Sequence, residues 1–408
     1  MRSVSEFDSM APETVEDPFA FYEALREQAP VHFDERLQTY LVSRYDGVWR
    51  VIHDTERFSS AIGPAALMPP MEAIQLLLTG HPPVHTLLTA DPPEHIRFRT
   101  LVSRAFAPRR VSKMIDSIRA LANELVDEFS GDGHLDLIAQ FGVPFPLTLL
   151  ADQLGVPRRD MPSFKRWADD IAAFLGGMIS NERYVECAQS ILDYQRYFEA
   201  RIEECRAEPR EGILSDVVHA RIDGVDPLSM AELLSIFQQF IVAGHETSTN
   251  MIGSTLLLLL RNPDQLALVR EDPALIPLAV EESLRLESPT QALFRIATCD
   301  VELEGVAIPG GSRVGVIYGS ANRDPRKFDD PDRFDLRRPN LREHLAFGHG
   351  THYCVGAGLA RAEGAVALET LLARTRNLRL AAQGNDFAHH PSFILRGLKQ
   401  LHLEFDPA

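Results

Sequence analysis

The sequence predicts a mainly α-helical fold with smaller β-sheets, and three observations support this class. Capped helix starts recur along the chain, a stretch from about residue 228 to 260 has no proline, and short β-type segments gather after residue 288. Hydrophobic residues make up 45% and charged residues 24%, which is ordinary for a globular protein. Because no repeat or flexible linker interrupts the chain, we expect residues 1–408 to form a single domain.

The individual elements follow from local signals. Residues 31–45 contain two β-rich runs around a polar turn and predict a hairpin. Asp91 as N-cap, Pro92 as first helical residue and Glu94 predict a helix that ends at Pro108. Asp272 and Pro273 start a second helix of this kind, which Pro289 closes. The proline-free stretch predicts one helix of roughly 45 Å, at 1.5 Å per residue.

The remaining segments are less regular. Residues 59–88 mix prolines with many apolar residues and predict a long loop that covers a ligand. Short strands follow residue 288, then a loop rich in Asp, Pro and Arg from 322 to 342, and a helix begins just past Cys354. The segment 393–405 predicts a closing pair of strands.

Charge and targeting signals narrow the function classes. The net charge of -17 argues against nucleic acid or an anionic membrane as the main partner, because both require a basic surface. The first residues show neither a signal peptide nor a transit pattern, and the run that ends at Leu260 follows a polar segment, so we expect no membrane span. A cytoplasmic location is the resulting expectation.

Cys354, in "AFGHGTHYCVGAGLARAE", raises four possibilities: a disulfide, a zinc site, a nucleophile, or a thiolate bound to another metal. The four cysteines have no paired spacing, and Cys187, Cys205 and Cys299 are typical of free thiols. His344, His349 and His352 offer zinc ligands beside Cys354, although two spaced ligand pairs are missing. His352 is a candidate base for a nucleophilic cysteine, but no other part of that machinery is evident. The following helix favours a thiolate.

Four distant segments decide among these possibilities, because together they resemble the cytochrome P450 family of haem-thiolate monooxygenases. "FGHGTHYCVG" resembles the family's cysteine loop, "ESLR" its Glu-x-x-Arg helix, "AGHET" its oxygen-activation segment and "HIRFR" an earlier His-x-x-x-Arg pair. They occur in the family's order and spacing. The resemblance implies the cytochrome P450 fold, with haem b (iron protoporphyrin IX) between a long central helix and the cysteine-ligand loop and helix.

The resemblance also implies cofactor contacts. Cys354 is the axial ligand of the haem iron, and Phe347, Gly348 and Gly356 shape the loop around its sulfur. The haem propionates are bound by four basic residues: His95, Arg99, Arg295 and His352. Ala243 and Gly244 belong to the segment where the central helix opens beside the iron.

Further roles follow from the same resemblance. Glu282 and Arg285 form a buried ion pair with Arg338, although Arg337 is close enough in sequence to compete. Glu246 relays protons and Thr247 hydrogen-bonds dioxygen. His245, between Gly244 and this pair, is a further titratable group that we hypothesise to affect proton delivery.

The implied reaction inserts one oxygen atom from dioxygen into a C–H bond of a lipophilic molecule, such as a terpenoid, fatty acid or steroid-like compound. Five apolar residues match the family's pocket: Val242, Leu293, Phe294, Phe393 and Ile394. The chain has no dinucleotide fingerprint, so we expect its electrons to come from a ferredoxin and an NAD(P)H-dependent reductase. Arg109, Arg110 and Lys113 offer a basic patch for the ferredoxin. We expect the protein to be a monomer. A peroxide-driven peroxygenase, a non-catalytic haem carrier or gas sensor, and a zinc protein remain alternatives.

Overall fold

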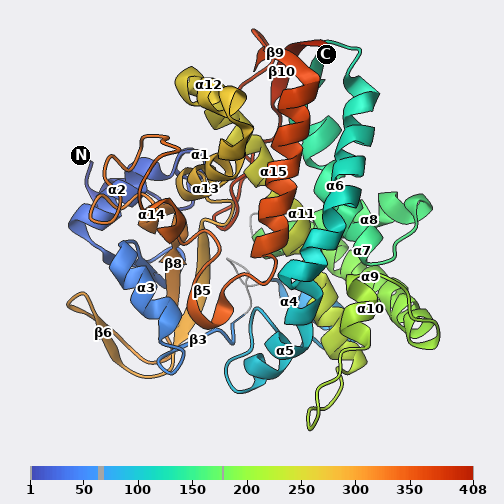
Figure 1. Cartoon of the computed structure of the whole chain (residues 1–408). Helices are drawn as coiled ribbons and strands as arrows, with labels where there is room; N and C mark the ends of the chain where they lie inside the picture. Colours follow the sequence, from blue (N-terminus) through green and yellow to red (C-terminus); the bar gives the residue numbers. More distant parts are fainter. Residues whose placement is uncertain (1, 63–68, 177–178, 408) are drawn as a thin grey trace. The chain divides into compact units, whose positions relative to one another are not determined.

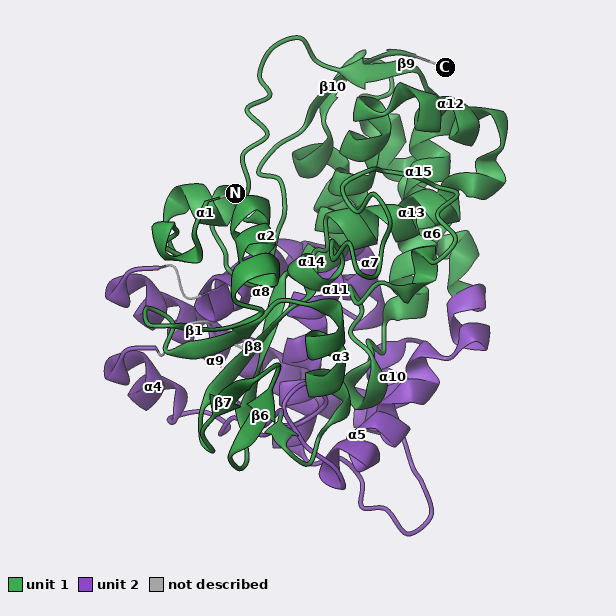
Figure 2. Cartoon of the chain, turned by 90° about the vertical axis from the view of Figure 1, so that its left-hand side faces the viewer, with its two compact units in different colours: residues 1–59, 114–145, 246–408 green, residues 60–113, 146–245 purple. Residues whose placement is uncertain are grey.

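The computed structural model describes residues 2–62, 69–176 and 179–407 of the chain (Figure 1). Its contacts group into two compact units, coloured separately in Figure 2. Unit 1 comprises Met1–Ser59, Met114–Phe145 and Glu246–Ala408, and unit 2 comprises Ser60–Lys113 and Pro146–His245. We describe each unit by itself, and the single-domain organisation stays a prediction.

Unit 1 contains the β-sheets. Its five-stranded sheet has the order β1-β2-β8-β5-β3, in which β2 and β8 are parallel and the other neighbours antiparallel. A three-stranded sheet has the order β4-β10-β9, and β6 pairs with β7. The strands are β1 (Val31–Asp34), β2 (Thr39–Val42), β3 (Phe58–Ser59), β4 (His134–Asp136), β5 (Ala292–Ala297), β6 (Val301–Leu303), β7 (Val306–Ile308), β8 (Arg313–Ile317), β9 (Thr375–Leu380) and β10 (His402–Pro407).

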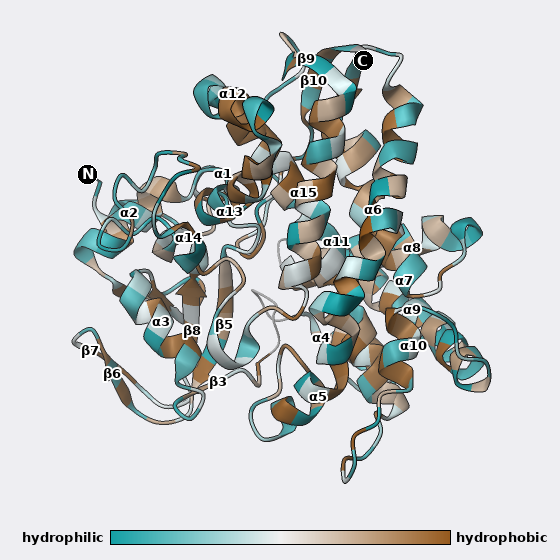
Figure 3. Ribbon diagram, in the orientation of Figure 1, coloured by the Kyte–Doolittle hydropathy of each residue, from teal (hydrophilic) through white to brown (hydrophobic). Residues whose placement is uncertain are grey.

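Three helices of unit 1, α3, α14 and α15, contact strands of these sheets. Apolar residues of β5 and β8 form part of a buried cluster with α3 and α14, and both strands carry hydrophobic colour in Figure 3. Such burial supplies the main driving force for folding. The helices wholly within this unit are α1 (Pro12–Glu16), α2 (Phe19–Gln28), α3 (Tyr45–His53), α12 (Pro263–Glu271), α13 (Ile276–Leu286), α14 (Tyr318–Ala321) and α15 (Ala357–Arg374).

Unit 2 is helical. Its longest helix, α9, packs on α8 through aromatic contacts such as that of Trp167 with Tyr197, whose ring centroids are 4.9 Å apart. The helices wholly within this unit are α4 (Met71–Leu77), α5 (Glu94–Ser103), α8 (Met161–Gly176), α9 (Asn181–Ala207) and α10 (Ile213–Val218). One of the four boundaries between the units directly follows β3, and the other three fall within helices: α6 (Pro108–Phe129), α7 (Pro144–Gln153) and α11 (Met230–Arg261).

Several sequence predictions are confirmed. The hairpin forms as β1 and β2, and α11 is the long proline-free helix. Asp272 accepts a hydrogen bond from the backbone N–H of Ala274 and caps the turn before α13. Short strands follow residue 288, and α15 begins after Cys354. Among residues 2–62, 69–176 and 179–407, no helix combines the length and apolar content that crossing a bilayer requires.

Three predictions of local structure need correction. The helix expected from Pro92 begins at Glu94, because a residue that precedes a proline is disfavoured in the helical conformation and Pro92 precedes Pro93. The side chain of Asp91 accepts a hydrogen bond from the backbone N–H of Ser60. The expected loop at 59–88 contains the helix α4, and its residues 63–68 lie outside the described residues. The expected closing pair of strands contributes only β10, whose partners are β4 and β9.

Candidate active site around the cysteine loop

The cysteine loop, residues 346–356, is a tight turn closed by its own backbone. The N–H of Cys354 donates to the carbonyl of Phe347 over 2.9 Å, and the N–H of Gly348 donates to the carbonyl of Leu345, also over 2.9 Å. Gly348 and Gly350 have φ values of 64° and 67°, in the left-handed region that favours glycine. The half-buried Cys354 is therefore held directly before α15, where the helix dipole favours a thiolate.

Polar residues of α13 and α15 form a hydrogen-bonded group beside this loop. Arg361, on α15, donates to the Glu281 carboxylate, and its guanidinium lies 4.5 Å from the ring centroid of Phe347. His344 Nε2 is 2.8 Å from Glu281 Oε2. Burial by itself raises the pKa of Glu281, but hydrogen bonds from His344 and Arg361 outweigh it and lower the pKa to about 2. The buried carboxylate is thus held ionised between two donors.

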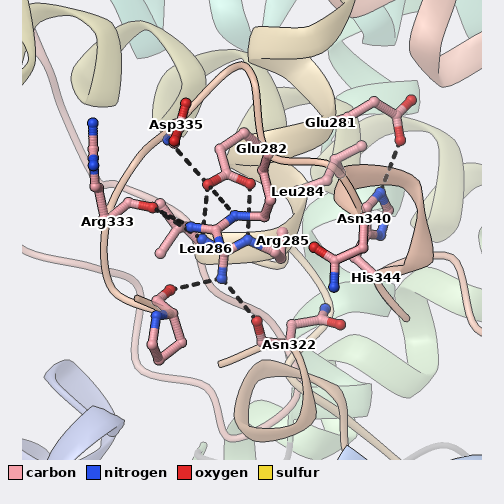
Figure 4. Close-up of polar contacts among 12 residues, drawn as sticks. Glu281, Glu282, Leu284, Arg285, Leu286, Asn322, Arg333, Asp335, Asn340 and His344 are labelled. Atoms are coloured by element: carbon pink, nitrogen blue, oxygen red, sulfur yellow. Dashed lines mark hydrogen bonds and ion pairs between the residues drawn. The ribbon is translucent and has the colours of Figure 1, made fainter. Parts of the chain in front are cut away.

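A second buried carboxylate, Glu282, lies at the centre of the network in Figure 4. Arg285 forms a bidentate ion pair with Glu282 in which both N–O distances are 2.8 Å. Both side chains are 0% exposed. Arg338 Nε donates to Glu282 Oε1 over 3.0 Å, whereas Arg337 is exposed. The structure therefore places Arg338, not Arg337, in this pair. The two arginines compensate the charge of the Glu282 carboxylate, whose burial would otherwise be energetically costly.

Asn322 links this network to the cysteine loop. Its backbone carbonyl accepts from Arg285 over 2.9 Å, and its side-chain oxygen accepts from the backbone N–H of Leu345 over 2.6 Å. The sequence analysis did not identify Asn322, Glu281 or Arg361. Nothing in the local sequence distinguishes them, because their contacts join segments that are far apart in the chain.

The predicted oxygen-activation segment lies on α11. Glu246 and Thr247 are half-buried there, and His245 is buried. Burial lowers the pKa of His245 to about 4, so its imidazole is neutral at neutral pH. The next residue, Ser248, donates to Glu363 of α15 over 2.6 Å. Burial raises the pKa of Glu363 to about 8, so at neutral pH this carboxyl is mostly a neutral acid, and its partner Ser248 is the residue next to Thr247.

The predicted propionate contacts are divided between the units. In unit 2, His95 is 2% exposed and Arg99 half-buried on α5, and burial, followed by the charge of Arg99, lowers the pKa of His95. In unit 1, Arg295 is 5% exposed, and its guanidinium donates to the carbonyl of Phe294 over 2.7 Å. Within the described residues Arg295 has no carboxylate partner. His352 is half-buried in the cysteine loop.

These observations test whether the residues present fit a haem. One cysteine thiolate suits the single axial position that a protein side chain fills in a haem-thiolate site. A buried guanidinium without a protein carboxylate suits a ligand that brings its own carboxylates. Both features fit the group. Cys354 and Arg295 of unit 1 would then hold it.

The other predicted residues have distinct surroundings. Phe294 and Phe393 are buried and stack with ring centroids 6.3 Å apart, and Arg313 covers the Phe294 ring at 3.7 Å. Ile394 is buried, whereas Leu293 and Val242 are half-buried and Ala243 is exposed on α11. Gly244 has only Leu150 side-chain carbons within 4 Å of an added Cβ. Gly356 is so close to the thiol that its added Cβ would lie 4.0 Å from Cys354 Sγ.

The alternative chemistries of Cys354 find no support in the described part of the chain. No group of three or more His, Cys, Asp or Glu side chains there is arranged to hold a metal ion. His344 is instead engaged with Glu281. None of the four cysteines forms a disulfide there.

Comparison with known proteins agrees with the family resemblance that the sequence motifs indicate. The family model described as Cytochrome P450 matches residues 179–386. The chain is 37% identical to 6-deoxyerythronolide B hydroxylase of Saccharopolyspora erythraea over 398 residues, 96% of each protein. It superposes on the structure of cytochrome P450 CREJ in complex with (4-ethylphenyl) dihydrogen phosphate with a TM-score of 0.92, 30% identity, and coverage of 99% and 100%. With CYP109E1 from Bacillus megaterium in complex with testosterone, the TM-score is 0.82, the identity 32% and the coverage 95% and 99%.

The fold and the cysteine site define a haem-dependent oxidoreductase. The chain belongs to the cytochrome P450 family, whose members bind haem b, and its relatives include a hydroxylase. The protein is accordingly a cytochrome P450 monooxygenase.

Proposed function

We propose that this monooxygenase hydroxylates a medium or large lipophilic molecule with electrons from a ferredoxin and an NAD(P)H-dependent ferredoxin reductase. One oxygen atom of dioxygen enters a C–H bond, and the other leaves as water with two electrons and two protons. The haem part of this proposal rests on two features of unit 1: Cys354 in its tight loop, and the buried Arg295, which has no carboxylate partner among the described residues.

The bound haem supplies the iron and the redox chemistry that amino-acid side chains lack. The chain's residues have three tasks. Cys354 holds the iron as a thiolate, while His95, Arg99, Arg295 and His352 bind the propionates. The acid of Glu246 passes protons toward the hydroxyl of Thr247, which orients oxygen. Glu363, a neutral acid bonded to Ser248, supports the same stretch of α11.

The absorption spectrum of the reduced, carbon monoxide-bound protein tests the cysteine assignment. We expect the thiolate-ligated spectrum from the wild type and its loss in Cys354→Ser, while Cys299→Ser, a change of an exposed thiol, keeps it. A normal thiolate spectrum from Cys354→Ser would refute the assignment. Retained haem content, measured separately, distinguishes a lost ligand from a lost cofactor.

The electron source needs a separate experiment. Product formation that requires NAD(P)H, reductase and ferredoxin supports the proposal, whereas turnover driven only by peroxide would favour the peroxygenase. In unit 2, Arg110 lies 3.2 Å from Glu211 and 2.8 Å from Asp216, so its charge is compensated, whereas Arg109 and Lys113 are exposed. We therefore assign the ferredoxin contact to Arg109 and Lys113. Charge reversal at both should slow electron transfer at low salt, and an unchanged rate would exclude this contact.

The substrate class rests on the apolar character of Val242, Leu293 and Ile394 and on the ligands of related proteins. The relatives' names point to 6-deoxyerythronolide B and testosterone, both compatible with a lipophilic substrate. A panel of macrolactones, steroids, terpenoids and fatty acids, screened by the shift of the haem absorption band, should give saturable binding. If only small hydrophilic compounds shifted the band, the lipophilic assignment would be wrong.

A further inference from the structure

Two exposed histidines from distant parts of the sequence meet on the surface of unit 1. His53 is the last residue of α3, and His349 lies in the cysteine loop. His53 Nε2 and His349 Nδ1 are 2.8 Å apart. Trp49, one turn earlier on α3, packs against both imidazoles, with a centroid distance of 4.2 Å to each. This histidine pair contains no residue of the cysteine–haem contact set.

We propose that the histidine pair His53–His349 binds a divalent transition-metal ion of the zinc, copper or nickel class. Nitrogen ligands at about 2.0–2.1 Å from a metal lie about 2.9 Å apart in a right-angled copper or nickel site and about 3.3 Å apart in a tetrahedral zinc site. The observed 2.8 Å separation is therefore close to that of a two-nitrogen chelate. Imidazole suits these ions, whereas magnesium and calcium prefer oxygen.

The hydrogen bonds around His53 select its ligand form. His53 Nδ1 is 2.7 Å from the carbonyl of Trp49, which can only accept, so Nδ1 carries the proton. Nε2 then presents its lone pair toward His349. Metal-binding histidines commonly donate their second ring N–H to a carbonyl in this way, which fixes both tautomer and ring orientation. The proton that His349 Nδ1 shares with His53 would move to Nε2 of His349 when the ion binds.

Electrostatics and packing favour a cation at this position. His53 is at the C-terminal end of α3, where the helix dipole is negative. Burial, and then the neighbouring His53, lower the pKa of His349, so the neutral imidazole that a metal requires predominates at neutral pH. A Cβ added to Gly350 would lie 3.1 Å from His53 Cδ2, so the glycine leaves room for the His53 ring beside the loop.

The site has two protein ligands, and no third His, Cys, Asp or Glu completes a cluster within the described residues. Water would fill the remaining coordination positions, so binding should be reversible and not structural. A bound ion would tie the end of α3 to the loop that carries Cys354. A higher concentration of available metal would therefore make the cysteine loop more rigid.

The test is a zinc titration of the haem-loaded protein, without a histidine tag and after chelator treatment, followed by calorimetry. We expect one ion per chain for the wild type and a loss of at least about tenfold in affinity for His53→Gln and for His349→Gln. His134→Gln is the matched control, because His134 is an exposed histidine of unit 1 whose Nδ1 is also 3.0 Å from a backbone carbonyl, that of Asp132. Magnesium should not bind.

A spectroscopic measurement tests the ligands directly. Copper(II) bound to the wild type should show magnetic coupling to two imidazole nitrogens, and His53→Gln should reduce this to one or none. His53 is exposed and lies outside the cysteine loop, so its variant should keep its fold and haem even where His349→Gln does not. The proposal is wrong if the wild type binds no zinc, or if His53→Gln binds it as tightly as the wild type.

Discussion

Replacing Arg338 by methionine should destabilise unit 1 strongly, because it removes one of two cations from a fully buried carboxylate. Glu282 is 0% exposed, and Arg338 is 5% exposed. The change removes the 3.0 Å bond to Glu282 and bonds to the carbonyls of three residues of the preceding loop: Asp329, Asp330 and Arg333. Methionine keeps much of the apolar stem of the arginine, so the loss is mainly electrostatic.

The magnitude follows from how well the groups that lose Arg338 are compensated by their remaining partners. The carbonyl of Arg333 keeps its bond from Arg285, and Asp329 and Asp330 are exposed, so water can solvate their carbonyls. Glu282 keeps Arg285 but loses half of its compensating charge. Breaking a buried ion pair costs about 3–5 kcal/mol. At about 2.1 cal/mol/K of unfolding entropy per residue, we expect the unfolding midpoint of this protein to fall by roughly 3–6 °C.

The assay is thermal unfolding followed by circular dichroism and by haem absorbance. Arg337→Met is the matched control, since Arg337 is the exposed neighbour and its side chain makes no contact with Glu282. Its midpoint should stay near that of the wild type. The reasoning fails if Arg338→Met unfolds at the same temperature as Arg337→Met. Haem loss at a temperature where the circular dichroism is unchanged would show that the pair supports the cofactor alone.

Three further predictions concern titratable and catalytic groups. The pKa of Glu363 is about 8 in the folded protein and 4.5 ordinarily, so between pH 4.5 and 8 the folded state binds one more proton than the unfolded state. The free energy of unfolding should therefore fall as the pH rises from 4.5 to 8, by up to about 1.4 kcal/mol per pH unit, and Glu363→Gln should flatten this slope in denaturant titrations. Glu281, with a pKa of about 2 against 4.5, stabilises above pH 4.5 and loses its contribution as the pH falls toward 2, so Glu281→Gln should be least harmful in acid. Thr247→Ala should lower product formed per NAD(P)H consumed by roughly tenfold or more, and unchanged coupling would remove Thr247 from proton delivery.

The reacting segments could be predicted from the sequence because each is defined over a few consecutive residues. The cysteine loop, the Glu-x-x-Arg turn and the acid–alcohol pair on α11 are local patterns, and glycines with φ above zero at 348 and 350 agree with the tight turn that the loop requires. The capped turn at Asp272 was predictable for the same reason, whereas the start predicted from Asp91 and Pro92 was wrong.

Contacts between distant segments could not be predicted from local sequence patterns. Glu281 and Arg361 are 80 residues apart, and Ser248 and Glu363 are 115 apart, so neither partner signals the other in the sequence. The choice of Arg338 over Arg337 also required the fold, since only the side chain that faces inward reaches Glu282. The closing strand was misjudged because its partners, β4 and β9, are chosen by sheet pairing and not by a neighbouring turn.

The sequence by itself determined the class of this protein, and it predicted Cys354 as the haem ligand and residues 243–247 as the oxygen-activation segment, because these patterns depend on residue type at fixed short spacing. Tertiary structure decided which charges compensate one another, which acids stay neutral and which histidines meet. Those properties depend on burial and on distances through space, and a pKa or a metal site responds to the groups nearest in space, however far apart they are along the chain.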